Sequence, residues 1–371
     1  MSEAVAARAE SLDAGPAPIE VRRQGALAEF VLNRPKVLNA FSDGMRQVMA
    51  AEIPALARNP DVYAVAITSG SGKAFCAGGD VRALAAEARR DLASAKAYFA
   101  GEYALNWLLE CFSKPTLSLI NGICMGSGVG ISAYNTHRVA GENYKFAMPE
   151  TAIGLFPDVG AAHVLAQLPW PIGLYLGLTG RTIGPGDAYG LGLVTHCIEA
   201  RHFPTILPGL ADAEPIDPLL DGLHEDPGEG PLARETGLIR KFFGAGSLDD
   251  IIEGLKTAKG AEAAFASATL GGLSKRSPTS LRITDRHIRS ARTLDLRETL
   301  IQDYRIACRC LEAPDFIEGV RALIIDKGSQ PNWQPSALSE VIATQVAHYF
   351  APLEGGELEL PTRAEMQAAR V

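Results

Sequence analysis

The sequence predicts an α/β fold whose C-terminal part is helical. Two short apolar strands are expected at residues 19–23 and 26–32, and two buried strands at 62–68 and 116–120. Helical patterns separate these strands, and such alternation favours a layered α/β core. From about residue 200 onward the strand patterns disappear while helical patterns continue. We therefore expect an α/β core followed by a helical region.

The first elements have clear local signals. Gln24-Gly25, between the first two strands, is a hairpin turn. Ser42 begins a helical pattern over 42–57 and is a good N-cap, because its hydroxyl can accept an unbonded N–H of the first turn. Asp80 precedes a helical pattern over 81–89 in the same way.

A long helical pattern and a strand then lead into a glycine-rich turn. The helix is expected over 93–112 and the strand over 116–120. Met125-Gly126-Ser127-Gly128 follows, before a short apolar segment at 129–134 that can be helical. A strand that ends in such a turn and opens a helix leaves backbone N–H groups unbonded, and the helix dipole adds to their pull on negative charge.

Two acidic residues follow on a loop. Glu150 and Asp158 cannot share one helix face, because Gly154 and Pro157 interrupt any helix between them. They meet only if the loop folds back. Each acid also has a structural alternative, with Asp158 as the N-cap of a helix over 159–168 and Glu150 as a solvated loop residue. Backbone donors beside two acids are the components of acyl chemistry.

The rest of the chain is mostly helical by pattern. Short elements come first, namely helices at 171–178 and 184–190 and a last strand at 194–198. Helical patterns then occupy 232–243, 248–256, 260–270, 280–291, 296–310, 315–326 and 336–349.

These patterns divide the chain into four parts. We expect a disordered tail at 1–18, an α/β core with the candidate site at 19–200, a mainly helical region at 201–352 and a C-terminal tail at 353–371. Within the helical region, 208–231 is acidic and rich in proline and glycine, which predicts a loop or hinge.

Composition excludes several classes of function. The chain has 371 residues, of which 47% are hydrophobic and 21% charged, as in ordinary globular proteins. A net charge of −8 without a basic block argues against a nucleic-acid partner. No apolar run can span a bilayer, so no membrane partner is expected. The seven histidines show no metal-ligand spacing, so we expect neither a metal nor another cofactor.

The cysteines and the first residues indicate a cytoplasmic location. The six cysteines are scattered and offer no disulfide framework, which fits a reducing compartment. Residues 1–18 contain Glu3, Glu10 and Asp13 and no continuous apolar stretch, unlike a secretory signal or an acid-poor transit peptide. Whether the chain forms a homo-oligomer is left open.

The two glycine-rich turns can each be ordinary strand-to-helix connections. Ala77-Gly78-Gly79-Asp80 and Met125-Gly126-Ser127-Gly128 lack the lysine of a phosphate-binding P-loop, and neither has the dinucleotide-binding pattern. Because each turn closes a strand and opens a helix, the pair predicts N–H donors that converge.

Three motifs together resemble the enoyl-CoA hydratase/isomerase (crotonase) superfamily. They are Ala77-Gly78-Gly79-Asp80, Asn121-Gly122-Ile123-Cys124-Met125-Gly126-Ser127-Gly128 and Met148-Pro149-Glu150. The run 146–160 is similar to the 3-hydroxyisobutyryl-CoA hydrolase branch, as are the distant segments 277–281 and 315–322. The resemblance covers roughly residues 19–350.

The resemblance implies a fold and a binding mode. The fold is a crotonase-like spiral of ββα units with C-terminal helices over or beside it. The substrate is an acyl-CoA thioester, so coenzyme A is part of the substrate and no separate cofactor is implied. Two backbone N–H groups hold the thioester oxygen, and they fall on Gly79 and Ser127. Serine replaces the usual glycine at the second position but keeps the N–H, provided that its φ is one that serine tolerates. Further substrate contacts are implied at Glu102, Ala77, Asp80 and Gly126.

The acids favour the hydrolase branch. Hydratases of this superfamily carry a glutamate three residues after the second oxyanion donor, where this chain has Gly130. The hydrolase branch is similar to this chain in having Glu150 and Asp158 instead. The implied reaction is the hydrolysis of 3-hydroxyisobutyryl-CoA in valine catabolism. Glu150 would attack the carbonyl or activate water, and Asp158 would orient the substrate's 3-hydroxyl or move a proton.

Three alternatives remain open from the sequence. A dienoyl-CoA isomerase or an enoyl-CoA hydratase needs an acid near Gly130, which is missing. A catalytically inactive CoA-binding protein is favoured by Ser127 alone.

If Glu150 and Asp158 approach each other closely, repulsion should raise the pKa of one of them.

Overall fold

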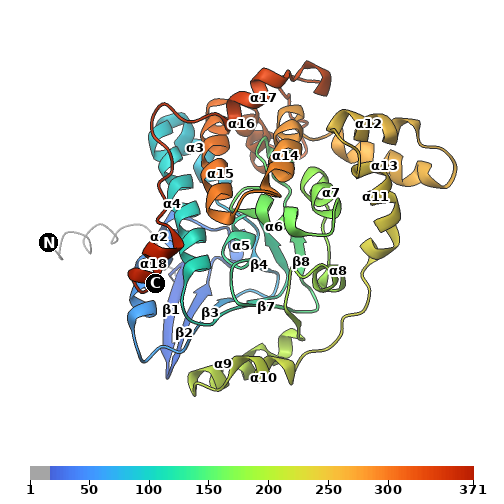
Figure 1. The fold of residues 1–371 in the computed structure, drawn as a ribbon. Coiled ribbons are helices and arrows are strands. Elements are labelled where there is room, and N and C mark those ends of the chain that lie inside the picture. Colours follow the sequence, from blue (N-terminus) through green and yellow to red (C-terminus); the bar gives the residue numbers. More distant parts are fainter. Residues whose placement is uncertain (1–16) are drawn as a thin grey trace.

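The computed structural model describes residues 17–371, so the tail expected at 1–18 lies almost wholly outside them. A six-stranded sheet in the order β1-β2-β3-β5-β7-β9 lies in the lower half of the view, below most of the helices (Figure 1). Its strands are β1 (Ile19–Gln24), β2 (Leu27–Leu32), β3 (Ala64–Ser69), β5 (Thr116–Ile120), β7 (His137–Ala140) and β9 (His196–Cys197). Neighbours pair in parallel except β1 and β2, which form the predicted hairpin. The parallel strands β3 and β5 are almost wholly buried, as strands covered on both faces must be.

A smaller parallel sheet lies beside the first. It contains β4 (Ala74–Cys76), β6 (Ile123–Met125) and β8 (Lys145–Ala147). Successive strands alternate between the sheets, since β3, β5 and β7 belong to the larger sheet and β4, β6 and β8 follow each of them in the smaller one. A helix comes after each such pair. The predicted spiral of ββα units is therefore confirmed.

Four of these strands are not predicted by the sequence patterns. β4, β6, β7 and β8 have three or four residues each. An alternating pattern cannot be recognised over so short a length, and the adjoining glycine turns hide it further. These strands are stabilised by the neighbours with which they pair.

Seven helices belong to the core. They are α2 (Asp43–Arg58), α3 (Val81–Arg90), α4 (Leu92–Cys111), α5 (Ser127–Gly130), α6 (Ala161–Gln167), α7 (Ile172–Thr179) and α8 (Pro185–Gly190). Ser42 and Asp80 cap α2 and α3 as predicted, accepting the N–H groups of Met45 and Ala83. The helix expected at 129–134 is wrong in its bounds, because α5 already begins at Ser127.

The loop or hinge predicted at 208–231 is partly wrong. This stretch includes the end of α9 (Phe203–Ala211) and all of α10 (Ile216–Asp221). Of the prolines that suggested a loop, Pro215 is the N-cap of α10 and Pro218 lies in its first turn, whereas Pro208 lies inside α9. The two helices bury Ile206, Leu210 and other apolar side chains in a second core cluster, together with strand residues such as Leu117. Burial of these side chains, rather than helix propensity, explains the helices.

The remaining helices follow in the C-terminal part. They are α11 (Thr236–Phe243), α12 (Leu248–Thr257), α13 (Ala263–Leu273), α14 (Pro278–Ala291), α15 (Leu296–Glu312), α16 (Pro314–Val320), α17 (Ala343–Phe350) and α18 (Arg363–Ala368). Short 3₁₀ or π turns connect them and the core elements, namely η1 (Pro35–Val37), η2 (Glu150–Ile153), η3 (Ala200–His202), η4 (Pro231–Glu235), η5 (Gly260–Glu262), η6 (Arg321–Ile325) and η7 (Leu338–Glu340). The helix α15 packs against α4, and α14 packs against α6 and α7, while α11, α12 and α13 form an arm at one side (Figure 1).

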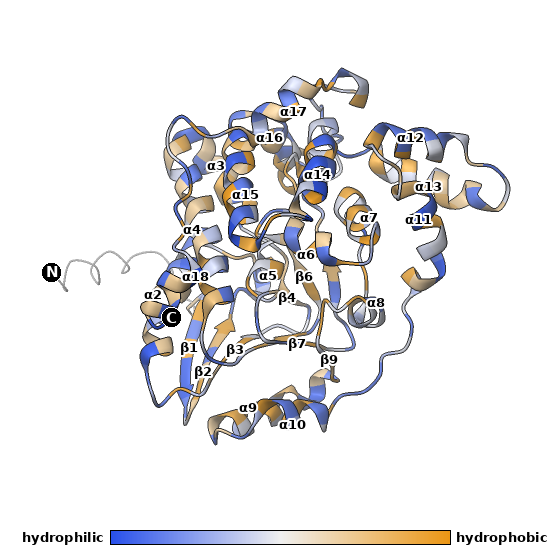
Figure 2. Cartoon of the chain, viewed as in Figure 1, coloured by the Kyte–Doolittle hydropathy of each residue, from blue (hydrophilic) through white to orange (hydrophobic). Residues whose placement is uncertain are grey.

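Hydropathy explains which helices are central. Figure 2 shows α7 mainly in apolar colours and α14 with both kinds of residue. Seven of the eight residues of α7 are buried, whereas α14 buries one face, with Leu281, Ile283 and Ile288 among its core residues. Within residues 17–371, no helix has the length and apolar character needed to cross a membrane.

The segment 353–371, expected to be a C-terminal tail, includes a packed helix. Met366 of α18 is buried, and the Trp107 indole N–H of α4 donates to the Pro361 carbonyl at 2.8 Å. The Arg363 guanidinium also pairs with Glu110 of α4 at 2.6 Å. This part of the chain therefore lies against the core.

Candidate active site

The two glycine-rich turns converge. A Cβ built at Gly126 would lie 3.2 Å from the Gly78 Cα and 4.0 Å from the Gly79 nitrogen. Gly78 and Gly126 have φ values of +111° and +50°, which side chains rarely adopt, so glycine is required at both positions. Within residues 17–371, the N–H groups of Gly79 and Ser127 donate to no backbone or side-chain acceptor. Two free donors therefore lie on adjoining turns.

Serine is compatible with its place in the second turn. Ser127 is the first residue of α5, and its φ is outside the left-handed region. The condition under which a serine keeps the N–H donor is therefore met. Its hydroxyl oxygen lies 3.0 Å from where a Cβ of Gly79 would be.

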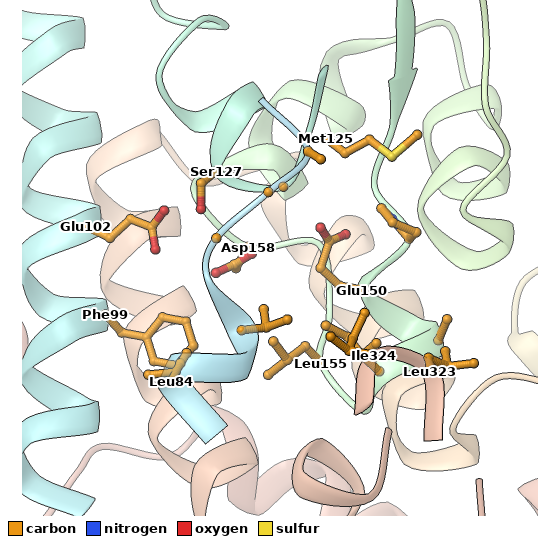
Figure 3. Close-up of a pocket in the computed structure, with 18 of the residues that line it drawn as sticks. Leu84, Phe99, Glu102, Met125, Ser127, Glu150, Leu155, Asp158, Leu323 and Ile324 are labelled. Atoms are coloured by element: carbon orange, nitrogen blue, oxygen red, sulfur yellow. The ribbon is translucent and has the colours of Figure 1, made fainter. Parts of the chain in front are cut away.

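A cavity of about 270 Å³ opens at these turns. Figure 3 shows the carboxyl groups of Glu102, Glu150 and Asp158 around this cavity, with Ser127 beside them and apolar side chains on the opposite side. Its lining residues are Ala77, Gly78, Gly79, Val81, Leu84, Tyr98, Phe99, Glu102, Met125, Gly126, Ser127, Pro149, Glu150, Ala152, Ile153, Leu155, Asp158, Leu323 and Ile324. The loop between Glu150 and Asp158 thus folds back and brings both acids to one cavity.

Glu150 is buried at the start of η2. A Cβ at Gly126 would lie 3.1 Å from its Oε1 atom, and no residue in the described part of the chain hydrogen-bonds its Oε2 atom. Burial raises the pKa of Glu150 to about 8, although its own backbone N–H and the charge of Arg276 oppose this rise. The alternative of a solvated loop acid is wrong, because the side chain is only 7% exposed.

Asp158 is also buried, and its Oδ2 accepts the Tyr103 hydroxyl at 2.8 Å. Burial raises the pKa of Asp158 well above its usual value, and the negative charges of Glu102, Glu150 and Asp303 raise it further. The helix-cap alternative is wrong, because the N-cap of α6 is Gly160.

Glu102 extends into the cavity from α4 (Figure 3). Burial raises its pKa to about 7, while the hydroxyls of Ser127 and Tyr98 and the charge of Arg46 oppose this rise. Three carboxyl groups with raised pKa values therefore share one site, which is a typical sign of acid–base function.

The other predicted contacts divide into two groups. Ala77 and Gly126 line the cavity, as does Glu102. Asp80 does not, because it caps α3 and pairs with Arg34 at 3.1 Å. In the structure its carboxylate thus has a structural role.

Several residues of the site are not among the sequence candidates. Tyr98 and Tyr103 come from α4, where Tyr98 lies four residues before Glu102 and hence on the same helix face. This four-residue spacing is the sequence feature from which Tyr98 could have been predicted to lie near the site. Leu323 and Ile324 come from η6, far away in the sequence, and no local signal connects them to the cavity.

Position 130 has no room for a side chain. A Cβ at Gly130 would lie 2.8 Å from the Asn106 Nδ2 atom and 2.9 Å from the Val159 Cβ. The Asn106 amide donates to the Gly130 carbonyl at 3.0 Å, so it is held in place. A glutamate at this position would require the backbone to move.

The part of the chain that the structure describes has no group of three or more His, Cys, Asp or Glu side chains arranged to hold a metal ion. All six cysteines are free and buried.

Comparison with known proteins gives consistent results. The family described as "Enoyl-CoA hydratase/isomerase" matches residues 27–350. The chain is 38% identical to the 3-hydroxyisobutyryl-CoA hydrolase of Xenopus tropicalis over 348 residues, which is 91% of this chain and 90% of that protein. It is 36% identical to 3-hydroxyisobutyryl-CoA hydrolase 1 of Arabidopsis thaliana, covering 96% and 97%, and 35% identical to the human enzyme of the same kind, covering 91% and 90%.

Two solved structures have the same fold. A carnitinyl-CoA dehydratase from Mycobacterium thermoresistibile superimposes with a TM-score of 0.87 at 33% identity, covering 93% of this chain and 99% of that one. An enoyl-CoA hydratase from Rhodobacter sphaeroides gives a TM-score of 0.86 at 34% identity, covering 93% and 100%.

Proposed function

The chain belongs to the enoyl-CoA hydratase/isomerase family, and on that premise we propose that it hydrolyses 3-hydroxyisobutyryl-CoA, a short β-hydroxyacyl-CoA thioester of valine catabolism, to the free acid and CoA. The relatives to which this chain is 35–38% identical are named as hydrolases of this ester. The observation that carries the proposal is one cavity with two free N–H groups and the buried acids Glu150 and Asp158.

In this proposal the oxyanion forms between the two turns. The thioester oxygen accepts the N–H groups of Gly79 and Ser127, and negative charge grows on it as the carbonyl carbon is attacked. Removing one such donor typically costs about 3–4 kcal/mol of transition-state stabilisation. Because these donors make no other hydrogen bond with the described residues, they need no rearrangement before the reaction.

Glu150 serves as the group that initiates attack. Its carboxylate either activates a water molecule as a general base or attacks the carbonyl directly. A pKa of about 8 makes it a stronger base than an exposed glutamate and keeps a fraction of it ionised at neutral pH. Arg276 stabilises the ionised form.

Asp158 serves as the protonated partner. Burial and the neighbouring carboxylates raise its pKa and so favour the protonated carboxyl group, which can donate a hydrogen bond to the substrate's 3-hydroxyl or a proton to the departing CoA sulfur. CoA is part of the substrate, and we propose no separate cofactor or metal in this reaction.

A hydratase or dehydratase is the second candidate, because the two proteins of known structure that share this fold are named as a carnitinyl-CoA dehydratase and an enoyl-CoA hydratase. Adding water across a double bond in this superfamily uses a carboxylate at position 130, where a Cβ would already contact Asn106 and Val159. Hydrolysis requires no side chain at this position. The packing around Gly130 therefore supports the hydrolase.

The test is to incubate the purified protein with 3-hydroxyisobutyryl-CoA and a thiol reagent. Release of free CoA supports the hydrolase. An ultraviolet change without free thiol would indicate a hydratase or an isomerase instead, and binding without either signal would indicate an inactive CoA-binding protein.

Substitution of Ser127 tests the oxyanion donor. Ser127→Pro should lower kcat by about 10²–10³-fold, because proline lacks the N–H but has a φ that suits the first residue of a helix. Ser127→Gly keeps the N–H and should change kcat by less than about fivefold, since a single hydroxyl hydrogen bond is worth roughly 1 kcal/mol. Steady-state kinetics of the two variants check this. Equal losses in both would show that the hydroxyl, not the N–H, matters.

Location and assembly stay predictions. Several curated relatives are named as mitochondrial proteins, which is said of those proteins. Cell fractionation would test the cytoplasmic location expected for this chain, and light scattering would show whether it forms a homo-oligomer.

A further inference from the structure

A buried carboxylate outside the cavity holds the backbone of the Asp158 loop. Asp303 of α15 is fully buried, and its Oδ2 atom accepts the Gly160 N–H at 2.7 Å. Its Oδ1 atom lies 2.5 Å from Nε2 of His287 on α14, which is also fully buried. Asp303 therefore connects two C-terminal helices with a residue two positions after Asp158.

The neighbouring hydrogen bonds assign the proton of His287. The Ser290 hydroxyl donates its one hydrogen to the His287 carbonyl at 2.9 Å, so its oxygen accepts from Gln302 Nε2, also at 2.9 Å. The other hydrogen of Gln302 Nε2 goes to His287 Nδ1 at 2.7 Å. Because Nδ1 is an acceptor, a neutral His287 carries its proton on Nε2 and donates it to Asp303. The Asp303 carboxylate thus has a donor on each oxygen.

The loop that Asp303 holds has a conformation that needs support. Val159, between Asp158 and Gly160, has a φ of +54°, which is rare for a β-branched residue and strained. Such strain persists only where the surroundings enforce it. Here the Tyr134 hydroxyl donates to the Val159 carbonyl at 2.6 Å, and Asp303 holds the next N–H. The strained residue is next to the acid that lines the cavity.

We propose that His287 and Asp303 are positioning residues that fix the Asp158 carboxyl in the cavity, through the backbone of Val159 and Gly160. This inference rests on the proposed function, because it assigns a task to the acid used there. It also gives the helical C-terminal part of the chain a direct role in the site.

The charge of Asp303 acts on Asp158 as well. Asp158 is faced by the carboxyl groups of Glu102, Glu150 and Asp303, and each of the three raises its pKa. The other titratable side chains that feel its charge are those of Tyr98, Tyr103, Tyr134 and Cys310. Asp303 itself is faced by His287, with Tyr103 and Tyr134 near enough to feel its charge. Neutralising Asp303 should therefore lower the pKa of Asp158.

Asp303→Asn tests the proposal. It removes the charge and weakens the hold on Gly160, so kcat for the CoA ester should fall by about 10–100-fold while KM changes less than about threefold. In a plot of kcat against pH, the inflection caused by the titration of Asp158 should move to lower pH by roughly half a unit or more. Asp187→Asn is the matched control, because Asp187 is a buried carboxylate that accepts the Leu232 N–H at 2.9 Å and does not line the cavity. Its pH profile should match that of the wild type.

His287→Gln and His287→Leu separate positioning from packing. Glutamine can still donate to Asp303, so it should retain kcat within about fivefold, whereas leucine leaves the carboxylate one donor short and should lose tenfold or more. The proposal is overturned if Asp303→Asn lowers thermal stability but keeps the wild-type pH profile, or if both His287 variants behave alike.

Should the wild type fail to hydrolyse the ester, the proposed function fails by itself. The pH dependence of ester binding, measured by calorimetry, then decides the inference, which requires a shift in Asp303→Asn and none in Asp187→Asn.

Discussion

Glu150→Gln should abolish CoA release while the protein still binds the CoA ester. We expect kcat to fall by about 10³-fold or more, because the amide can neither accept the water proton nor attack the carbonyl. The dissociation constant of the ester should change less than about threefold, since glutamine has the same shape and the N–H donors of Gly79 and Ser127 stay in place. Single-turnover kinetics and calorimetry measure the two quantities.

The same substitution should stabilise the fold at neutral pH. The folded-state pKa of Glu150 is raised from 4.5 to about 8, so the folded protein holds this proton where the unfolded chain has lost it. The contribution of the protonated form is complete below pH 4.5 and is lost as the pH rises towards 8. A neutral glutamine avoids this loss, so Glu150→Gln should raise the free energy of unfolding by roughly 3 kcal/mol at pH 7, and by little at pH 4.5.

Glu142→Gln is the control for both effects, because Glu142 is exposed on the turn between β7 and β8. It should leave turnover and the pH dependence of unfolding unchanged. Wild-type turnover in Glu150→Gln would remove Glu150 from the mechanism. If Glu150→Gln were less stable than the wild type at pH 7, that result would contradict the conclusion that burial without a partner raises the pKa of the Glu150 carboxyl group.

Gly128→Ala should separate the two glycine-rich turns. A Cβ at Gly128 would lie 2.4 Å from the Cys76 carbonyl oxygen and 2.9 Å from the Cys76 Cβ. Both contacts are with the strand that leads into the Gly79 turn, so one methyl group forces the turns apart. Such overpacking typically costs about 1–3 kcal/mol of stability. Because the Gly79 and Ser127 donors no longer converge, kcat should fall by about 10²-fold.

Gly271→Ala is the matched control. A Cβ at this exposed position in α13 meets nothing within 4 Å, and alanine favours a helix over glycine by about 0.5–1 kcal/mol. It should therefore stabilise the protein slightly and leave kcat unchanged. Thermal unfolding and steady-state kinetics of the two variants provide the comparison. If Gly128→Ala kept full activity, the closeness of the turns would be unimportant for the reaction.

Features with short-range causes could be predicted from the sequence. The caps Ser42 and Asp80 lie where predicted, and the hairpin turn, at residues 25–26, lies one residue from the predicted Gln24-Gly25, because a turn or a cap depends on a few neighbouring residues. The long helix α4 and the strand β5 are also correct to within about a residue at each end. The motif resemblance located the glycine turns and the acid loop, and the family comparison confirms the family.

Features that depend on remote partners could not be predicted. The strands β4, β6 and β8 are stable because they pair with one another. The helices α9 and α10 form although their prolines suggest a loop, because they bury apolar side chains against the larger sheet. Asp80 shows the converse case, since the motif implied a substrate contact while the structure places its carboxylate at the start of α3, paired with Arg34.

The sequence by itself determined the types of chemical group in the site and the local turns that present them. Tertiary structure alone decided that Glu150 and Asp158 line the same cavity and that position 130 has no room for a side chain. It also decided that Asp303 of a distant helix accepts the Gly160 N–H of the loop that carries Asp158. The physical reason is the distance along the chain over which each effect acts. Caps and turns act over a few residues, whereas removing a carboxyl group from water, and thereby shifting its pKa, takes many chain segments packed around one cavity.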